Sequence, residues 1–183
     1  MQIDRIYYPV ETLGYGKRIG IWTIGCKHHC YNCSNPELWD QNNERDISID
    51  QIIDCICKID NADGITITGG DPFEQPEELL ELLQRIRQLG YSDILVYTGY
   101  TFEELQKRGE ISNNILQNIG VLVDGMYIDE LNDNKSFRGS SNQRILILDD
   151  SLKERYYDAS EWERKTQILV NGDSIQAIGL PIK

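Results

Sequence analysis

The sequence has little positive charge and no long hydrophobic run. It contains 18 Lys and Arg against 30 Asp and Glu, which gives a net charge of −12 at pH 7. This balance argues against a protein that binds nucleic acid through a general basic face. No apolar run approaches the ~20 residues of a membrane-spanning helix, and residues 1–5 lack the basic-then-apolar pattern of a signal peptide. We therefore expect a cytosolic protein with neither membrane nor nucleic acid as a partner.

Internal repeats, low-complexity segments and linkers are also missing. A chain of 183 residues with 40% hydrophobic residues has the length and the apolar content for one packed domain. We expect a single domain spanning residues 1–183.

Short β-branched segments alternate with amphipathic ones along most of the chain. The expected strands are residues 20–24, 64–68, 94–98, 120–123 and 144–148. Helices are expected after the N-cap candidate Ser48, from Pro76, and after a Thr101–Glu104 capping box. Strands that alternate with helices at this spacing predict parallel βαβ units and an α/β fold.

The C-terminal segment has a different pattern. Residues 167–170 and 174–178 are strand-like and flank Asn171-Gly172, a pair that accepts the positive φ angles of a type I′ turn. The sequence therefore predicts an antiparallel β-hairpin after the parallel core.

Three of the five cysteines lie within eight residues. Cys26, Cys30 and Cys33 follow the first predicted strand, whereas Cys55 and Cys57 lie on a predicted helix. This uneven, odd-numbered set suits a thiolate metal site in a reducing compartment better than disulfides. Three soft thiolates on one short loop can hold three irons of a 4Fe-4S cluster and leave the fourth iron without a protein ligand.

Zinc is the alternative metal for these thiols, with His28 or His29 as the fourth ligand. Structural zinc sites usually pair a two-cysteine knuckle with a distant second pair of ligands, and the sequence contains no second pair. The spacing therefore favours an iron–sulfur cluster. Cys55 and Cys57 are expected to take no part in it.

The C-x3-C-x2-C motif after a first strand resembles the signature of the radical S-adenosylmethionine enzymes. Further segments resemble their glycyl-radical activating branch: Gly25-Cys26, Cys33 to Asp40, Gly69 to Pro72, Val123 to Gly125, and Phe137 to Arg144. The resemblance implies a partial (β/α) barrel that holds a 4Fe-4S cluster on Cys26, Cys30 and Cys33. S-adenosyl-L-methionine would chelate the open iron and be cleaved reductively to methionine and a 5′-deoxyadenosyl radical.

The resemblance also implies the partners. The radical would remove a Cα hydrogen from a glycine of a glycyl-radical enzyme of the anaerobic ribonucleotide reductase type, and a small electron-transfer protein would reduce the cluster. No side chain is expected to act as a general base, because hydrogen-atom abstraction requires none. Two alternatives stay open: a radical enzyme that acts on another glycyl-radical enzyme, a peptide or a small molecule, and a non-catalytic zinc-binding module.

Several polar and small residues at strand ends are expected to bind S-adenosylmethionine. Gly69-Gly70 ends a strand where the backbone can approach a ligand closely. Asp71, at a position where the family usually has Glu, can accept a hydrogen bond from the methionine ammonium. Thr98, at the end of the strand expected over residues 94–98, either reaches the ribose or the methionine carboxylate or is an ordinary strand terminus.

Asp71 can also be an ordinary residue of a strand-to-helix turn, and the other expected cofactor contacts have structural alternatives as well. Asp124 either faces the cavity or belongs to a tight turn, and Arg138 either binds the cofactor, shapes the surface for the partner's glycine loop, or lies in an ordinary polar loop. Asn32 precedes the third cysteine, where an aromatic residue often lies against adenine in the family. The full set of expected cofactor-binding residues is Asn32, Ser34, Gly69, Gly70, Asp71, Thr98, Asp124 and Arg138.

Overall fold

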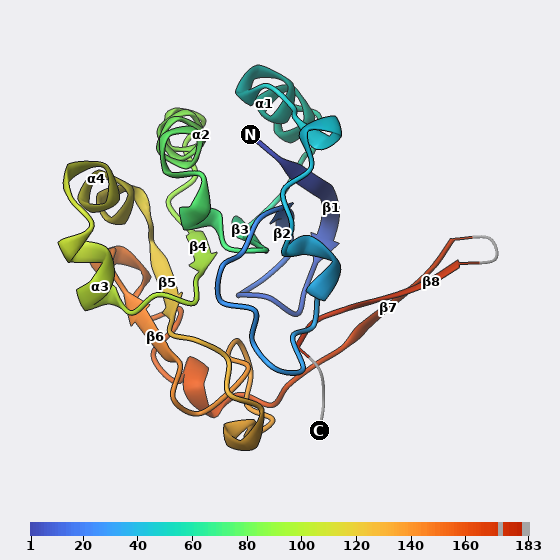
Figure 1. The fold of residues 1–183 in the computed structure, drawn as a ribbon, viewed down its shortest axis with the longest axis vertical. Coiled ribbons are helices and arrows are strands. Elements are labelled where there is room, and N and C mark those ends of the chain that lie inside the picture. The colour runs from blue at the N-terminus through green and yellow to red at the C-terminus, as the bar shows by residue number, and fades with distance from the viewer. Residues whose placement is uncertain (172–173, 181–183) are drawn as a thin grey trace.

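The fold is built on a mixed β-sheet with helices along one side (Figure 1). The computed structural model describes residues 1–171 and 174–180. Within these residues the main sheet has the order β1-β2-β3-β4-β5-β6. Its strands are β1 (Ile3–Val10), β2 (Arg18–Thr23), β3 (Gly64–Gly69), β4 (Ile94–Tyr97), β5 (Val121–Asp124) and β6 (Arg144–Ile147). Strands β2 to β5 run parallel, and β1 and β6 pair antiparallel at the two edges.

The helices follow the parallel strands in the way the βαβ pattern predicts. They are α1 (Ile49–Cys57), α2 (Pro76–Gln88), α3 (Phe102–Lys107) and α4 (Glu110–Asn118), and they lie along one side of the sheet (Figure 1). Ser48 and Thr101 each close a capping box, and Pro76 occupies the first turn of α2. The predicted starts of α1, α2 and α3 are therefore confirmed.

Alternate residues of each parallel strand face the helices. In β2 these are Ile19 and Ile21, which are fully buried with the apolar faces of α1 and α2. Period-two alternation sends Trp22 to the opposite, concave side of the sheet, where it packs with Val10 and Ile178. A consecutive strand order with helices on one side makes this sheet a partial barrel. The predicted α/β class is confirmed.

Two elements, β1 and α4, have no counterpart among the predicted ones. β1 is half-buried along most of its length, because it is an edge strand, so its sequence carries no clean alternation. α4 carries Asn at three of its nine positions, a residue with low helix propensity. Packing of Ile115 and Leu116 in the helix-side core stabilises α4 instead.

A hairpin follows the sheet, as predicted. β7 (Gln167–Asn171) pairs antiparallel with β8 (Ser174–Ile178) and extends away from the body of the molecule (Figure 1). The predicted turn at Asn171-Gly172 includes Gly172, which lies outside the described residues. Among the residues that are described, no helix has the length and apolar content that crossing a membrane requires.

Candidate active site

A cavity lies at the carboxyl ends of the parallel strands, where the loops after β2, β3, β4 and β5 converge. It is lined by Cys26, Cys30, Cys33, Ser34, Gly69, Gly70, Asp71, Thr98 and, among others, the base of the hairpin at Ala177–Leu180. The three cysteines of the motif therefore face the same space as most of the expected cofactor-binding residues. α/β folds of this kind place their chemistry at this end of the sheet.

The cysteine loop is curled by two residues with left-handed backbone. His29 has φ 46° and Asn32 has φ 55°, a conformation that asparagine and histidine tolerate better than most residues. The amide of Cys33 donates to the Cys30 carbonyl (3.1 Å), and the amide of Asn35 donates to Sγ of Cys33 (3.5 Å). At the start of the loop, the Cys26 amide donates to the Trp39 carbonyl (2.9 Å). The loop is thus closed on itself, with its sulfurs toward the cavity.

The three thiols have the chemistry that a thiolate metal centre requires. Burial raises the pKa of Cys26 to about 11 and also raises that of Cys30, so metal binding there must release protons. All three cysteines line one cavity. Three soft thiolates round a shared space are the donor set that iron–sulfur clusters use.

Asp71 ties three of the loops together. Its buried carboxylate accepts hydrogen bonds from the Phe73 amide (3.0 Å), the Thr98 hydroxyl (3.0 Å) and the Gly99 amide (2.8 Å). Nε2 of His28 lies 3.0 Å from Oδ2, and this contact raises the pKa of His28. A carboxylate has about four lone-pair positions. The protein's own donors therefore engage Asp71, and its contact with the methionine ammonium stays a prediction.

The glycines at the strand ends admit the cysteine loop. A Cβ atom on Gly70 would lie 2.4 Å from the Gly25 carbonyl oxygen, and one on Gly99 would lie 2.4 Å from Cδ2 of His28. The backbone also binds directly there, because the Asp71 amide donates to the Gly25 carbonyl (2.7 Å). The close approach that Gly69-Gly70 suggested is made by the chain itself, and a ligand contact at these glycines stays a prediction.

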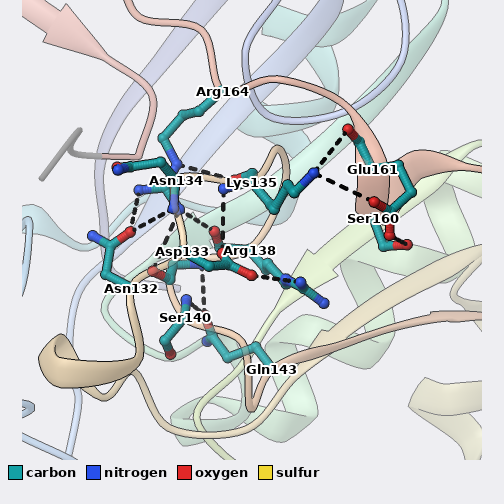
Figure 2. Close-up of polar contacts among 11 residues, drawn as sticks. Asn132, Asp133, Asn134, Lys135, Arg138, Ser140, Gln143, Ser160, Glu161 and Arg164 are labelled. Carbon is teal, nitrogen blue, oxygen red and sulfur yellow. Dashed lines mark hydrogen bonds and ion pairs between the residues drawn. The ribbon is translucent and has the colours of Figure 1, made fainter.

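The remaining expected residues lie apart from this group. The buried carboxylate of Asp124 accepts from the Phe102 amide (2.7 Å) and from Nε of Arg144 (3.0 Å), so it binds the first residue of α3 and pairs with β6. Arg138 donates to Asp133 (2.5 Å) within the 132–143 loop (Figure 2). Asn32 is exposed on the cysteine loop. Among the described residues that line the cavity, Asp124, Arg138 and Asn32 do not appear, whereas Ser34 and Thr98 do.

Two cavity residues carry no strong signal in the sequence. Tyr97 ends β4 on the concave side, and in the described part of the chain its buried hydroxyl has no hydrogen-bond partner. Burial raises its pKa. Gln143 joins two loops, because its Oε1 accepts from the Gly139 amide (2.7 Å) and its Nε2 donates to the Gly125 carbonyl (2.7 Å). Strand alternation places Tyr97 on the concave face, but only the folded chain brings Gln143 to Gly125.

Comparison with known proteins supplies the family. The model of a 4Fe-4S single cluster domain matches residues 12–146. The anaerobic ribonucleoside-triphosphate reductase-activating protein of Escherichia coli (strain K12) is 36% identical over 149 residues, which cover 76% of this chain and 94% of that protein. The protein of the same name from Enterobacteria phage T4 is 31% identical over 150 residues, covering 79% and 93%. The pyruvate formate-lyase-activating enzyme of Clostridium pasteurianum is 24% identical over 142 residues, covering 71% and 56%.

These matches decide between the two metals that the cysteine spacing left open. The matched region contains the whole cysteine loop and the strands that carry the cavity. A 4Fe-4S cluster is therefore the cofactor, and the zinc-module alternative is wrong. The chain belongs to the 4Fe-4S single cluster domain family of radical S-adenosylmethionine enzymes, in the branch that activates glycyl-radical enzymes.

Proposed function

We propose that this protein activates an anaerobic ribonucleoside-triphosphate reductase by forming a glycyl radical in it. The observation that carries the proposal is the convergence of Cys26, Cys30 and Cys33 with Asp71 and Thr98 on one cavity at the carboxyl ends of the strands. The relatives whose alignments cover about three quarters of this chain are named as activators of that reductase. The branch uses a radical to remove hydrogen, so no general base is assigned.

We assign the three thiols of the cysteine loop to three irons of the cluster. When bound, the cluster and S-adenosylmethionine supply a one-electron cleavage that yields a radical able to take a hydrogen atom from a glycine. The chain's own part is to bind and orient. Cys26, Cys30 and Cys33 give up protons as ligands, and the loop closure through Asp71 fixes where they point.

The remaining assignments concern S-adenosylmethionine. We assign Ser34, Gly69, Gly70, Asp71 and Thr98 to its binding, because all five line the cavity. Asn32, Asp124 and Arg138 lie outside the lining, so we assign them to the support of the loops round the cavity.

The test is anaerobic incubation of the cluster-loaded protein with the reductase from the same genome, S-adenosylmethionine and a reductant. Electron paramagnetic resonance should detect a glycine-centred signal on the reductase, and 5′-deoxyadenosine should accumulate. If no 5′-deoxyadenosine forms, the enzymatic proposal fails. If it forms while the reductase stays without a radical, the partner is a different one.

A second candidate is the activation of another glycyl-radical enzyme. The similarity to a pyruvate formate-lyase-activating enzyme favours it, although the identity is lower than for the reductase activators. Replacing the reductase by pyruvate formate-lyase in the same assay separates the two candidates, because only the true partner should acquire the glycine-centred signal.

Two further proposals concern the electron source and the compartment. We propose a small electron-transfer protein as the reductant and the cytoplasm as the location. The five cysteines are free thiols, and thiols and thiolate clusters persist in reducing compartments. The proposal for the reductant is tested by adding a purified, reduced flavodoxin or ferredoxin to the cluster-loaded protein. Reduction of the cluster is monitored as a loss of visible absorbance.

A further inference from the structure

One face of the β7–β8 hairpin is apolar and exposed. The register pairs Ile168 with Ala177 and Val170 with Ile175, so these four side chains share one face, which we call the arm face. Ile168 is 59% exposed, Val170 67% and Ile175 72%. A contiguous patch of solvent-exposed apolar side chains on a protein is typical of a binding surface for another protein, a membrane or a ligand.

The base of the same hairpin is firmly attached to the body of the protein. Ile178 is buried in the concave-side core, and its carbonyl accepts from the Thr12 hydroxyl (3.2 Å). Nε2 of Gln167 donates to the Pro9 carbonyl (2.9 Å). Just before β7, the Arg164 guanidinium donates to the carbonyls of Lys135 (3.0 Å) and Arg138 (2.6 Å), as Figure 2 shows. The hairpin is therefore an anchored arm whose outer part projects.

The arm face is continuous with the cavity. Ala177 belongs both to the arm face and to the cavity lining, and Ile178 and Leu180 line the cavity as well. A chain that lay along the arm would thus be led toward the space that the three cysteines share.

The hairpin is also open for further pairing. Within the described residues its sheet contains only β7 and β8, so each strand has an outer edge that no third strand covers. A two-stranded hairpin is marginally stable in water and gains from a third strand or from packing on its face. Exposed edges bind extended chains by backbone hydrogen bonds, with alternate side chains giving specificity.

We propose that the arm binds the glycine-bearing segment of the partner enzyme as an added strand. This inference rests on the proposed function. The arm face is formed by uncharged side chains alone, so it fits an extended, uncharged segment with apolar residues at alternate positions. Backbone hydrogen bonds would align the bound segment with the hairpin strands. Because the arm face reaches the cavity at Ala177, the aligned segment would enter the cavity there.

The test uses a double substitution, Val170→Glu with Ile175→Glu, in the otherwise complete protein. Its affinity for the full-length anaerobic reductase is measured by isothermal titration, and the expected result is a Kd at least tenfold weaker than for the unchanged protein. The glycyl-radical yield should fall at low reductase concentration and recover at high concentration, because the loss is one of binding. The matched control is Tyr157→Glu, which places the same charge on a residue that is 89% exposed and outside the hairpin. It should leave Kd unchanged.

A second variant guards against misfolding. Val170→Thr with Ile175→Thr keeps the β-branched shape and strand preference while it removes apolar surface, and it should weaken Kd at least threefold with an unaltered unfolding midpoint. An unchanged Kd in both double variants overturns the proposal and leaves the proposed function intact. A dimer of this chain that the substitutions dissociate in sedimentation assigns the face to a second copy and also overturns it. If the unchanged protein neither binds the reductase nor forms a radical in it, the proposed function fails and this inference with it.

Discussion

Nε2 of His28 lies 3.0 Å from Oδ2 of Asp71, across 43 residues of sequence. Both side chains are largely removed from solvent, with 12% of His28 and 1% of Asp71 exposed. The contact joins the cysteine loop to the loop after β3, and Thr98 and Gly99 extend it to the end of β4. His28 thereby sets the position of a loop whose neighbouring cysteines are to hold the cluster.

Replacement of His28 by Ala should loosen the cluster site. Mutation of residues that orient metal ligands typically lowers metal affinity 10- to 100-fold. We therefore expect the His28→Ala variant to lose its cluster to an iron chelator about tenfold faster, as monitored by visible absorbance. Tyr31→Ala is the matched control, because Tyr31 lies on the same loop and is 74% exposed. Equal rates for the two variants would contradict a specific role of the Asp71 contact.

Replacement of Cys30 by Ala should abolish the cluster and 5′-deoxyadenosine formation together. A thiolate is the ligand that soft iron sites select, and Ala offers no donor. Cys55→Ala serves as the comparison, since Cys55 is exposed on α1 and should leave the iron content at that of the unchanged protein. Iron analysis after anaerobic reconstitution measures both, and retained cleavage in Cys30→Ala would refute its assignment.

Asp124→Asn should reduce stability rather than cofactor binding. The substitution removes the charge that Arg144 pairs with and weakens the bond from the Phe102 amide, which should cost about 1–3 kcal/mol of unfolding free energy. Urea unfolding measures the loss, and the Kd for S-adenosylmethionine should stay within twofold. A tenfold weaker Kd without loss of stability would instead support the cofactor contact that the sequence suggests.

Tyr156 should make the metal-free protein sensitive to alkali. Burial raises its pKa to about 12, and its hydroxyl donates to Asp93 (2.9 Å). Because the folded-state pKa lies above the ordinary value near 10, the stabilisation is complete below about pH 10 and is lost as the pH rises toward 12. Tyr156→Phe should therefore be less stable by about 1 kcal/mol at pH 8.

The difference between Tyr156→Phe and the unchanged protein should shrink between pH 10 and 12, as measured by urea unfolding of both proteins. A difference that stays constant over this range would mean that Tyr156 ionises as easily in the folded chain as in the unfolded one.

Sequence patterns anticipated the parts of the molecule that short-range chemistry decides. The cysteine spacing, the capping box at Thr101 and the alternation of strand-like with amphipathic segments are all local, and the α/β class follows from that alternation. The contact of His28 with Asp71 was not predictable, because it depends on how two distant loops meet. Asp124 is a residue whose local position was misleading. Its place at a strand end suggested that it faces the cavity, but its carboxylate accepts a hydrogen bond from Arg144 of the antiparallel edge strand β6.

The close contact between the cysteine loop and the end of β4 restricts which residues position 99 can hold. Gly99 is partly exposed, so by accessibility alone a mutational screen would be expected to tolerate many residues there. A methyl group at this position would nevertheless overlap the imidazole of His28, and even alanine would push that ring from its place. Intolerance at position 99 would therefore reflect crowding between two loops, and an invariant glycine there would be no sign of a role in the chemistry.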